Sequence, residues 1–122
     1  MSLSPVLHLE EHGVHTVAFH HDEHGVADGD QVRHYFAGDF LKGTVGVRRM
    51  VIDLTGIASL DSASLGPLVQ KLREIQDLKG HLALAGVTSP ALKEIFALTR
   101  FDKVFPIYAT RAEAVAAVAS AG

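Results

Sequence analysis

The chain has 122 residues, of which 48% are hydrophobic and 20% are charged, and its formal net charge is −3 when the histidines are neutral. This length and apolar content predict one folded domain over residues 1–122 and exclude a largely disordered chain. The chain has no cysteine, which excludes disulfides and thiolate metal ligands, and its negative charge argues against general nucleic-acid binding.

The first third of the sequence predicts a hairpin, a loop and a helix. Alternating apolar residues over 7–9 and a β-rich run over 14–19 indicate two antiparallel strands. The polar, glycine-punctuated stretch 20–29 indicates a loop, and Asp30 is a candidate N-cap for the helix that follows. The apolar face of that helix is formed by Val32, Tyr35, Phe36 and Phe40. Nowhere is the chain apolar for long enough to cross a membrane, and it opens without a secretory leader, so we expect a cytoplasmic protein without membrane insertion.

Three further strands are predicted in the rest of the chain. Arg49–Leu54 and His81–Val87 are short apolar runs, the pattern of central strands that are covered on both faces. The run Val104–Ile107 contains Pro106, which cannot donate a hydrogen bond to a neighbouring strand and therefore favours a position at the edge of the sheet.

Helices are predicted after each of these strands. Apolar residues repeat at helical spacing from Leu65 to Ile75. Ser89 precedes a proline in the arrangement of an N-cap and a first helical residue, and Thr110 with Glu113 forms a capping box for the last helix. The sum is an α/β fold, with a largely parallel central sheet, an N-terminal β-hairpin and about four helices.

Three segments of the second half occur in the order typical of one family. They are Val-Ile-Asp-Leu-Thr-Gly-Ile over 51–57, Leu-Asp-Ser-Ala-Ser-Leu-Gly over 60–66, and Gly-His-Leu-Ala-Leu-Ala-Gly-Val over 80–87. The ending from Phe96 to Tyr108 continues the likeness. On these motifs the chain resembles the STAS family, the sulfate-transporter and anti-sigma-factor-antagonist domains.

The resemblance implies a non-catalytic bacterial regulatory module that needs no cofactor. Such a domain docks to an anti-sigma factor, an ATP-binding serine-kinase-like protein, and takes part in signal transduction and transcription regulation. It could also pair as a homodimer. In anti-sigma-factor antagonists the partner phosphorylates one of two hydroxyl residues in an Asp-Ser-Ser/Thr-Gly-Leu loop.

The matching loop supplies the candidate partner-binding residues, Asp61, Ser62, Ala63, Ser64, Leu65 and Gly66. Because Ala63 stands at the family's second hydroxyl position, Ser62 is the phosphorylation candidate and Ser64 the lesser one. We expect Ser64 to be the N-cap of the helix, since this register places Pro67 in the first turn, where no N–H donor is required. Asp53 joins the candidate site, because it lies near the carboxyl end of a central strand, although it could instead hold a loop.

Two other functions are compatible with the sequence. The same loop could serve a subunit of a larger signalling or lipid-transport complex without being phosphorylated, which Ala63 favours. Alternatively, the loop His20–His24 could make the chain a sensor of a small ligand or a metal, although solvated histidines are the default interpretation. Phosphate-binding loops, dinucleotide-binding loops and nucleophile elbows are missing from the sequence, so we predict neither an enzyme nor a metal centre.

Overall fold

The structure is a computed structural model that describes residues 6–121. Within this range the strands form one sheet in the order β1-β2-β3-β4-β5, in which β1 and β2 are antiparallel and the other neighbours are parallel. Their bounds are β1 (Val6–Glu11), β2 (Val14–Phe19), β3 (Arg49–Asp53), β4 (His81–Ala85) and β5 (Ile107–Tyr108). The N-terminal hairpin and the largely parallel sheet are thus confirmed.

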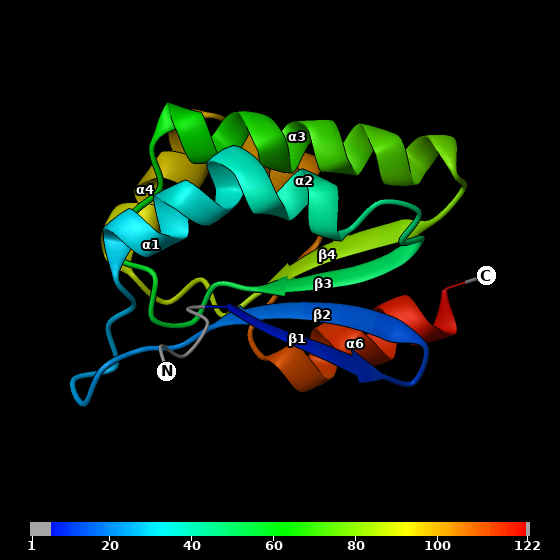
Figure 1. Ribbon diagram of the computed structural model, residues 1–122, viewed down its shortest axis with the longest axis horizontal. Helices are drawn as coiled ribbons and strands as arrows, with labels where there is room; N and C mark the ends of the chain where they lie inside the picture. Colours follow the sequence, from blue (N-terminus) through cyan, green and yellow to red (C-terminus); the bar gives the residue numbers. More distant parts are fainter. Residues whose placement is uncertain (1–5, 122) are drawn as a thin grey trace.

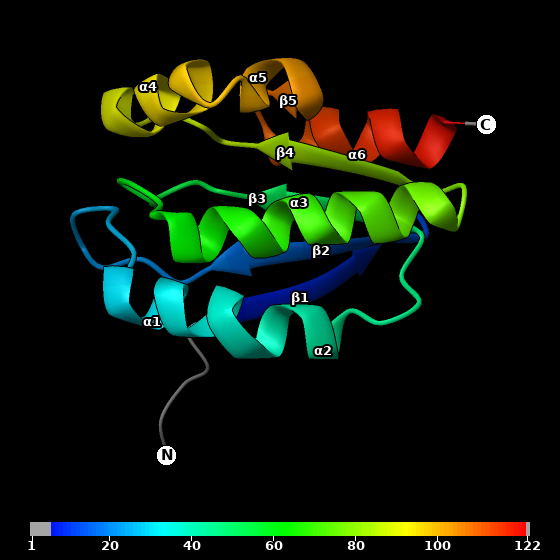
Figure 2. The same cartoon turned by 90° about the horizontal axis from the view of Figure 1, so that it is seen from above.

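Helices cover both faces of this sheet (Figure 1). They are α1 (Gly29–His34), a π-helical turn η1 (Tyr35–Asp39), α2 (Phe40–Gly43), α3 (Ser62–Asp77), α4 (Pro90–Leu98), α5 (Phe101–Val104) and α6 (Arg111–Ser120). The unbroken stretch 29–43 lies with α3 on one face, and α6 lies on the other. Seen from above, α4 and α5 lie beside the β4–β5 side of the sheet (Figure 2).

The alternation of side chains along each strand explains the two layers. Met50 and Ile52 of β3 pack under α1–α3, whereas Val51 between them packs against α6, and all three are fully buried. A strand with an uninterrupted apolar run in its centre therefore belongs in the middle of the sheet, as the sequence pattern predicted.

Local signals placed the starts of α4 and α6 correctly and the start of α1 wrongly. The side chains of Ser89 and Thr110 accept hydrogen bonds from Leu92 N and Glu113 N, as expected for N-caps. In contrast, α1 is capped by Asp28 and not by Asp30. An aspartate two residues earlier caps equally well and leaves Asp30 free to pair with Arg33 in the first helical turns.

The last strand is displaced from its predicted position. It spans Ile107–Tyr108 instead of Val104–Ile107, because residues 101–104 form the short helix α5. This helix places the ring of Phe101 with its centroid 5.4 Å from that of Phe105, which is buried. Aromatic packing therefore outweighs the β-rich composition of the segment. The strand still lies at the sheet edge, as Pro106 indicated.

One charged side chain lies in the core. Lys71 of α3 is fully buried, and its ammonium group donates to the carbonyl of Thr44 at 3.1 Å and pairs with the Glu74 carboxylate. The ring of Phe40 lies beside it, with its centroid 6.0 Å from Nζ. This lysine thus joins α3 to the end of the stretch 29–43. Among residues 6–121, none of the helices has the length and the apolar run that a membrane crossing requires.

Candidate functional site

The predicted docking residues 60–66 begin at the end of the loop 54–61, here called the docking loop, which leaves the carboxyl end of β3 and enters α3. Hydrogen bonds fix the loop to three neighbours: Leu54 N donates to the carbonyl of Ala85, Ala27 N donates to that of Gly56, and Ser89 Oγ donates to that of Ala58. These bonds are 2.8, 2.8 and 2.7 Å long. The loop is therefore held by β4, by the segment before α1 and by the start of α4.

The helix α3 begins at Ser62, and its N-cap is Asp61, whose carboxylate accepts a hydrogen bond from Ser64 N at 3.1 Å. The prediction that Ser64 is the N-cap is thus wrong. Pro67 lies inside the helix and has no N–H to donate to the carbonyl of Ala63. That carbonyl belongs to an exposed residue, so water can replace the missing donor and the earlier start is tolerated.

The loop residues differ in their exposure. Asp61, Ser62, Ala63 and Gly66 are exposed and Leu65 is half-buried, whereas Ser64 is only 1% exposed. Ser62, the first helical residue, is therefore exposed to solvent, whereas Ser64 lies on the buried side of α3.

An arginine that the sequence reading missed lies beside this surface. Arg33 of α1 places its Nε 3.4 Å from a carboxylate oxygen of Asp61, and its Nη2 lies 2.6 Å from Asp30. All three side chains are at least half exposed, so these pairs contribute little stability. Their effect on the site is to place the positive charge of Arg33 beside Asp61, the residue that precedes Ser62. The approach of α1 to α3 is a tertiary contact, which the local sequence does not encode.

A hollow of about 400 Å³ adjoins the start of α3. Apolar residues from the segment before α1, from α1 itself and from the docking loop form much of its wall, and Val26 is 47% exposed. The apolar lining consists of Val26, Ala27, Val32, Ile57, Ala58 and Leu60. The polar start of α3 thus adjoins a partly apolar hollow.

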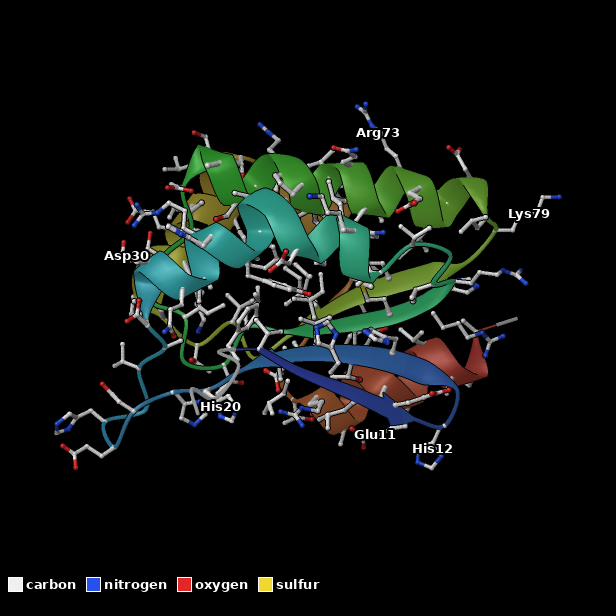
Figure 3. All side chains as sticks on the ribbon, viewed as in Figure 1. Glu11, His12, His20, Asp30, Arg73 and Lys79 are labelled. Carbon is white, nitrogen blue, oxygen red and sulfur yellow. The ribbon has the colours of Figure 1, made fainter. Side chains whose placement is uncertain are left out.

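The histidine loop flanks the same end of the molecule, where Figure 3 shows His20 below Asp30. Asp22 organises the loop by accepting hydrogen bonds from the amides of His24 and Val26 at 2.8 and 3.0 Å. The histidines from His20 to His24 are exposed. Within residues 6–121, three or more His, Asp or Glu side chains are nowhere arranged to hold a metal ion, so the metal-sensor alternative gains no support.

Asp53 does not reach the docking surface. It is 5% exposed, and its carboxylate accepts from the hydroxyl and the amide of Thr55 and, at 2.8 Å, from Arg111 of α6. Burial would raise the pKa of Asp53, but the hydrogen bonds from Thr55, together with the bond and the charge of Arg111, lower it below its ordinary value. This is the geometry of a residue that holds the loop and ties β3 to α6.

Comparison with known proteins assigns the fold to a family. The sequence pattern of the STAS domain matches residues 3–114. The chain belongs to the STAS domain family. This match covers the hairpin, the sheet and all helices up to the start of α6.

Individual STAS proteins agree with this assignment. The chain is 28% identical over 95 residues to the "putative anti-sigma factor antagonist BtrV" of Bordetella bronchiseptica, which covers 78% of each chain. An anti-sigma-factor antagonist (STAS) domain protein of Planctomyces limnophilus is 29% identical and superimposes with a TM-score of 0.77, covering 94% of this chain and 98% of that one. The phosphorylated form of the Bacillus cell fate determinant SpoIIAA shares the fold, with a TM-score of 0.57 and 18% identity over 93% of this chain and 98% of that one.

Proposed function

We propose that this STAS domain acts as an anti-sigma factor antagonist, binding a kinase-like anti-sigma factor in the bacterial cytoplasm and acting by docking instead of catalysis. The observation that carries the proposal is the exposed start of α3, where Asp61, Ser62 and Ala63 face solvent directly after a loop that is hydrogen-bonded to its neighbours. The curated and solved relatives with the same fold are named as anti-sigma factor antagonists, which supports this class of partner.

We further propose that Ser62 is the residue at which docking is switched. The unpaired N–H groups and the positive dipole end of a helix start favour a phosphate at its first residue. A phosphate brings a charge of about −1.5 to −2, which would lie beside the carboxylate of Asp61 and alter the surface that the partner contacts. Arg33, which already contacts Asp61, is the cation positioned to receive it.

Docking through the start of α3 can be tested with Ala63→Arg. Ala63 is exposed, so the longer side chain leaves the core unchanged but places bulk and charge in the middle of the proposed interface. We expect the Kd for the anti-sigma factor to rise about 30-fold or more, the scale of a lost hot spot. Binding is measured by calorimetry with the purified anti-sigma factor of the same bacterium.

The matched control is Ala116→Arg, which makes the same change at an exposed position of α6, on the opposite face of the sheet. This variant should bind like the parent. Equal affinity of Ala63→Arg and the parent would overturn the docking site, and circular dichroism shows whether both variants remain folded.

Phosphorylation is tested separately, by incubating the chain with the anti-sigma factor and ATP and measuring its intact mass. We expect the addition of one phosphate, which Ser62→Ala abolishes and Ser64→Ala retains, because Ser64 is buried. Retention of the phosphate in Ser62→Ala would refute the assignment to this residue.

A chain that binds but is never modified would support the second candidate, a STAS subunit that docks constitutively in a larger signalling or lipid-transport complex. The observation that favours this candidate is Ala63, which removes one of the two hydroxyl groups from the loop, while Ser64 is not accessible. The docking test with Ala63→Arg applies to it unchanged.

A further inference from the structure

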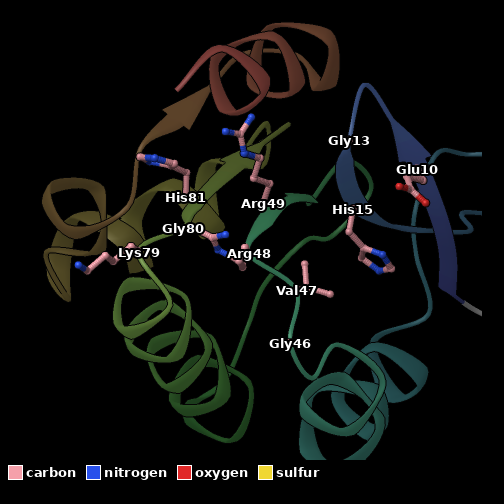
Figure 4. A pocket seen from close by; sticks show the side chains of 10 residues that line it. All are labelled: Glu10, Gly13, His15, Gly46, Val47, Arg48, Arg49, Lys79, Gly80 and His81. Carbon is pink, nitrogen blue, oxygen red and sulfur yellow. The ribbon is translucent and has the colours of Figure 1, made fainter. Parts of the chain in front are cut away.

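A second hollow, of about 440 Å³, lies at the amino ends of β3 and β4 (Figure 4). This is the end of the parallel strands opposite to the docking loop, so the hollow is separate from the proposed docking surface. Its ionisable lining residues are Glu10, His15, Arg48, Arg49, Lys79 and His81. Three Lys and Arg residues and one Glu thus line the hollow, in a chain whose net charge is −3.

Backbone carbonyls hold two neighbouring arginines of this hollow in place. Nε of Arg48 donates to the carbonyl of Leu78 at 3.0 Å, and the two terminal nitrogens of Arg49 donate to the carbonyls of Ala119 and Ala121 at 2.7 and 3.1 Å. Within the described residues, the terminal nitrogens of Arg48 have no protein partner. A guanidinium that is oriented through Nε and free at its fork is suited to bind an oxyanion with two parallel hydrogen bonds.

The other polar residues of the hollow contribute differently. In Figure 4 the side chains of Lys79 and His81 point away from the other lining residues, whereas His15 lies on the opposite side near Glu10. Burial, followed by the neighbouring His8, lowers the pKa of His15, and Nε2 of His15 already lies 3.0 Å from Nδ1 of His8, so this imidazole contributes little to the hollow. The carboxylate of Glu10 opposes the charge of the arginines.

Three of the residues that line the hollow are glycines, which leave its wall without side chains at those positions. Gly13, Gly46 and Gly80 line it, and no side chain projects from them into the space. Only glycine fits at position 80, since an added Cβ would lie 1.9 Å from the carbonyl oxygen of Arg48. The backbones of Arg48 and Gly80, which directly precede β3 and β4, are therefore in close contact.

We propose that this hollow binds a phosphate-bearing anion through the free fork of Arg48. A phosphate group presents planar pairs of oxygens that match a guanidinium fork. The same chemistry is offered by a small phosphorylated molecule in solution and by a phospholipid headgroup, and the experiment separates these two sources.

The site is tested by titrating the full chain with pyrophosphate at low ionic strength and following amide and arginine Nε–H signals by NMR. We expect saturable shifts at residues 46–49 and 80, about tenfold weaker binding in Arg48→Gln, and tighter binding in Glu10→Gln. In a parallel arm, sedimentation with phosphatidylglycerol vesicles is compared with phosphatidylcholine vesicles. Whichever probe binds in an Arg48-dependent manner identifies the source.

The matched control is Arg73→Gln, which removes the same charge from the outer face of α3, away from the hollow (Figure 3). This variant should bind like the parent. The proposal is overturned if neither probe binds, or if Arg48→Gln and Arg73→Gln weaken binding equally, since that would indicate diffuse charge attraction. Because Glu10 is exposed, Glu10→Gln keeps the test decisive even if Arg48→Gln folds poorly.

Discussion

Gly80→Ala is expected to lower the free energy of unfolding by about 3 kcal/mol or more. The methyl group would lie 1.9 Å from the carbonyl oxygen of Arg48 and 2.7 Å from its carbonyl carbon. That oxygen also accepts the hydrogen bond from His81 N, at 2.7 Å, with which β4 begins to pair with β3. Neither backbone can move without breaking the centre of the sheet. Urea unfolding followed by circular dichroism measures the change.

Gly38→Ala is the matched control for this prediction. An added Cβ at Gly38 meets nothing within 4 Å, and the residue lies in the helical stretch 29–43. Because alanine has a higher helix propensity and restricts the unfolded chain, we expect an unchanged or higher stability, by about 0.5–1 kcal/mol. If Gly80→Ala were as stable as this control, the close approach of β3 and β4 would not be a feature of the protein in solution.

Lys71→Ala is expected to lower the free energy of unfolding by about 2–4 kcal/mol. The substitution leaves a cavity beside Phe40 and removes one of the two donors to the carbonyl of Thr44, the other being Val47 N at 3.2 Å. Glu74 also loses its ion-pair partner, although its side chain is 39% exposed and can be solvated.

Lys71→Met separates the packing of this side chain from its charge. Methionine fills a similar volume without a buried ammonium group, so we expect most of the stability lost in Lys71→Ala to return. Lys93→Ala, at an exposed position of α4, should change the stability by no more than about 0.5 kcal/mol. Equal losses in Lys71→Ala and Lys71→Met would show instead that the charged hydrogen bonds carry the stabilisation.

The elements that the sequence predicts well are those whose position is determined by residues within the element itself or directly beside it. β3 and β4 each contain an uninterrupted apolar run because both of their faces are covered. Ser89 and Thr110 are followed by the residues that complete their caps, so the start of each helix could be located. The hairpin follows from the alternation of residues in β1 and the β-rich composition of β2.

The elements that were missed depend on contacts between distant segments. The helix α3 starts at Ser62 although Pro67 then interrupts its hydrogen bonds, because Asp61 supplies the cap and Ser64 packs into the interior. No local rule ranks these effects against the cost of the proline. Arg33 was missed for the same reason, because its contact with Asp61 depends on how α1 packs beside α3.

The fixation of the docking loop by β4, by the segment before α1 and by α4 has a kinetic consequence. A partner that binds there meets a backbone already in its final shape, so complex formation requires little ordering of the chain. Interface variants should therefore mainly change the dissociation rate of the complex and leave its association rate nearly unchanged.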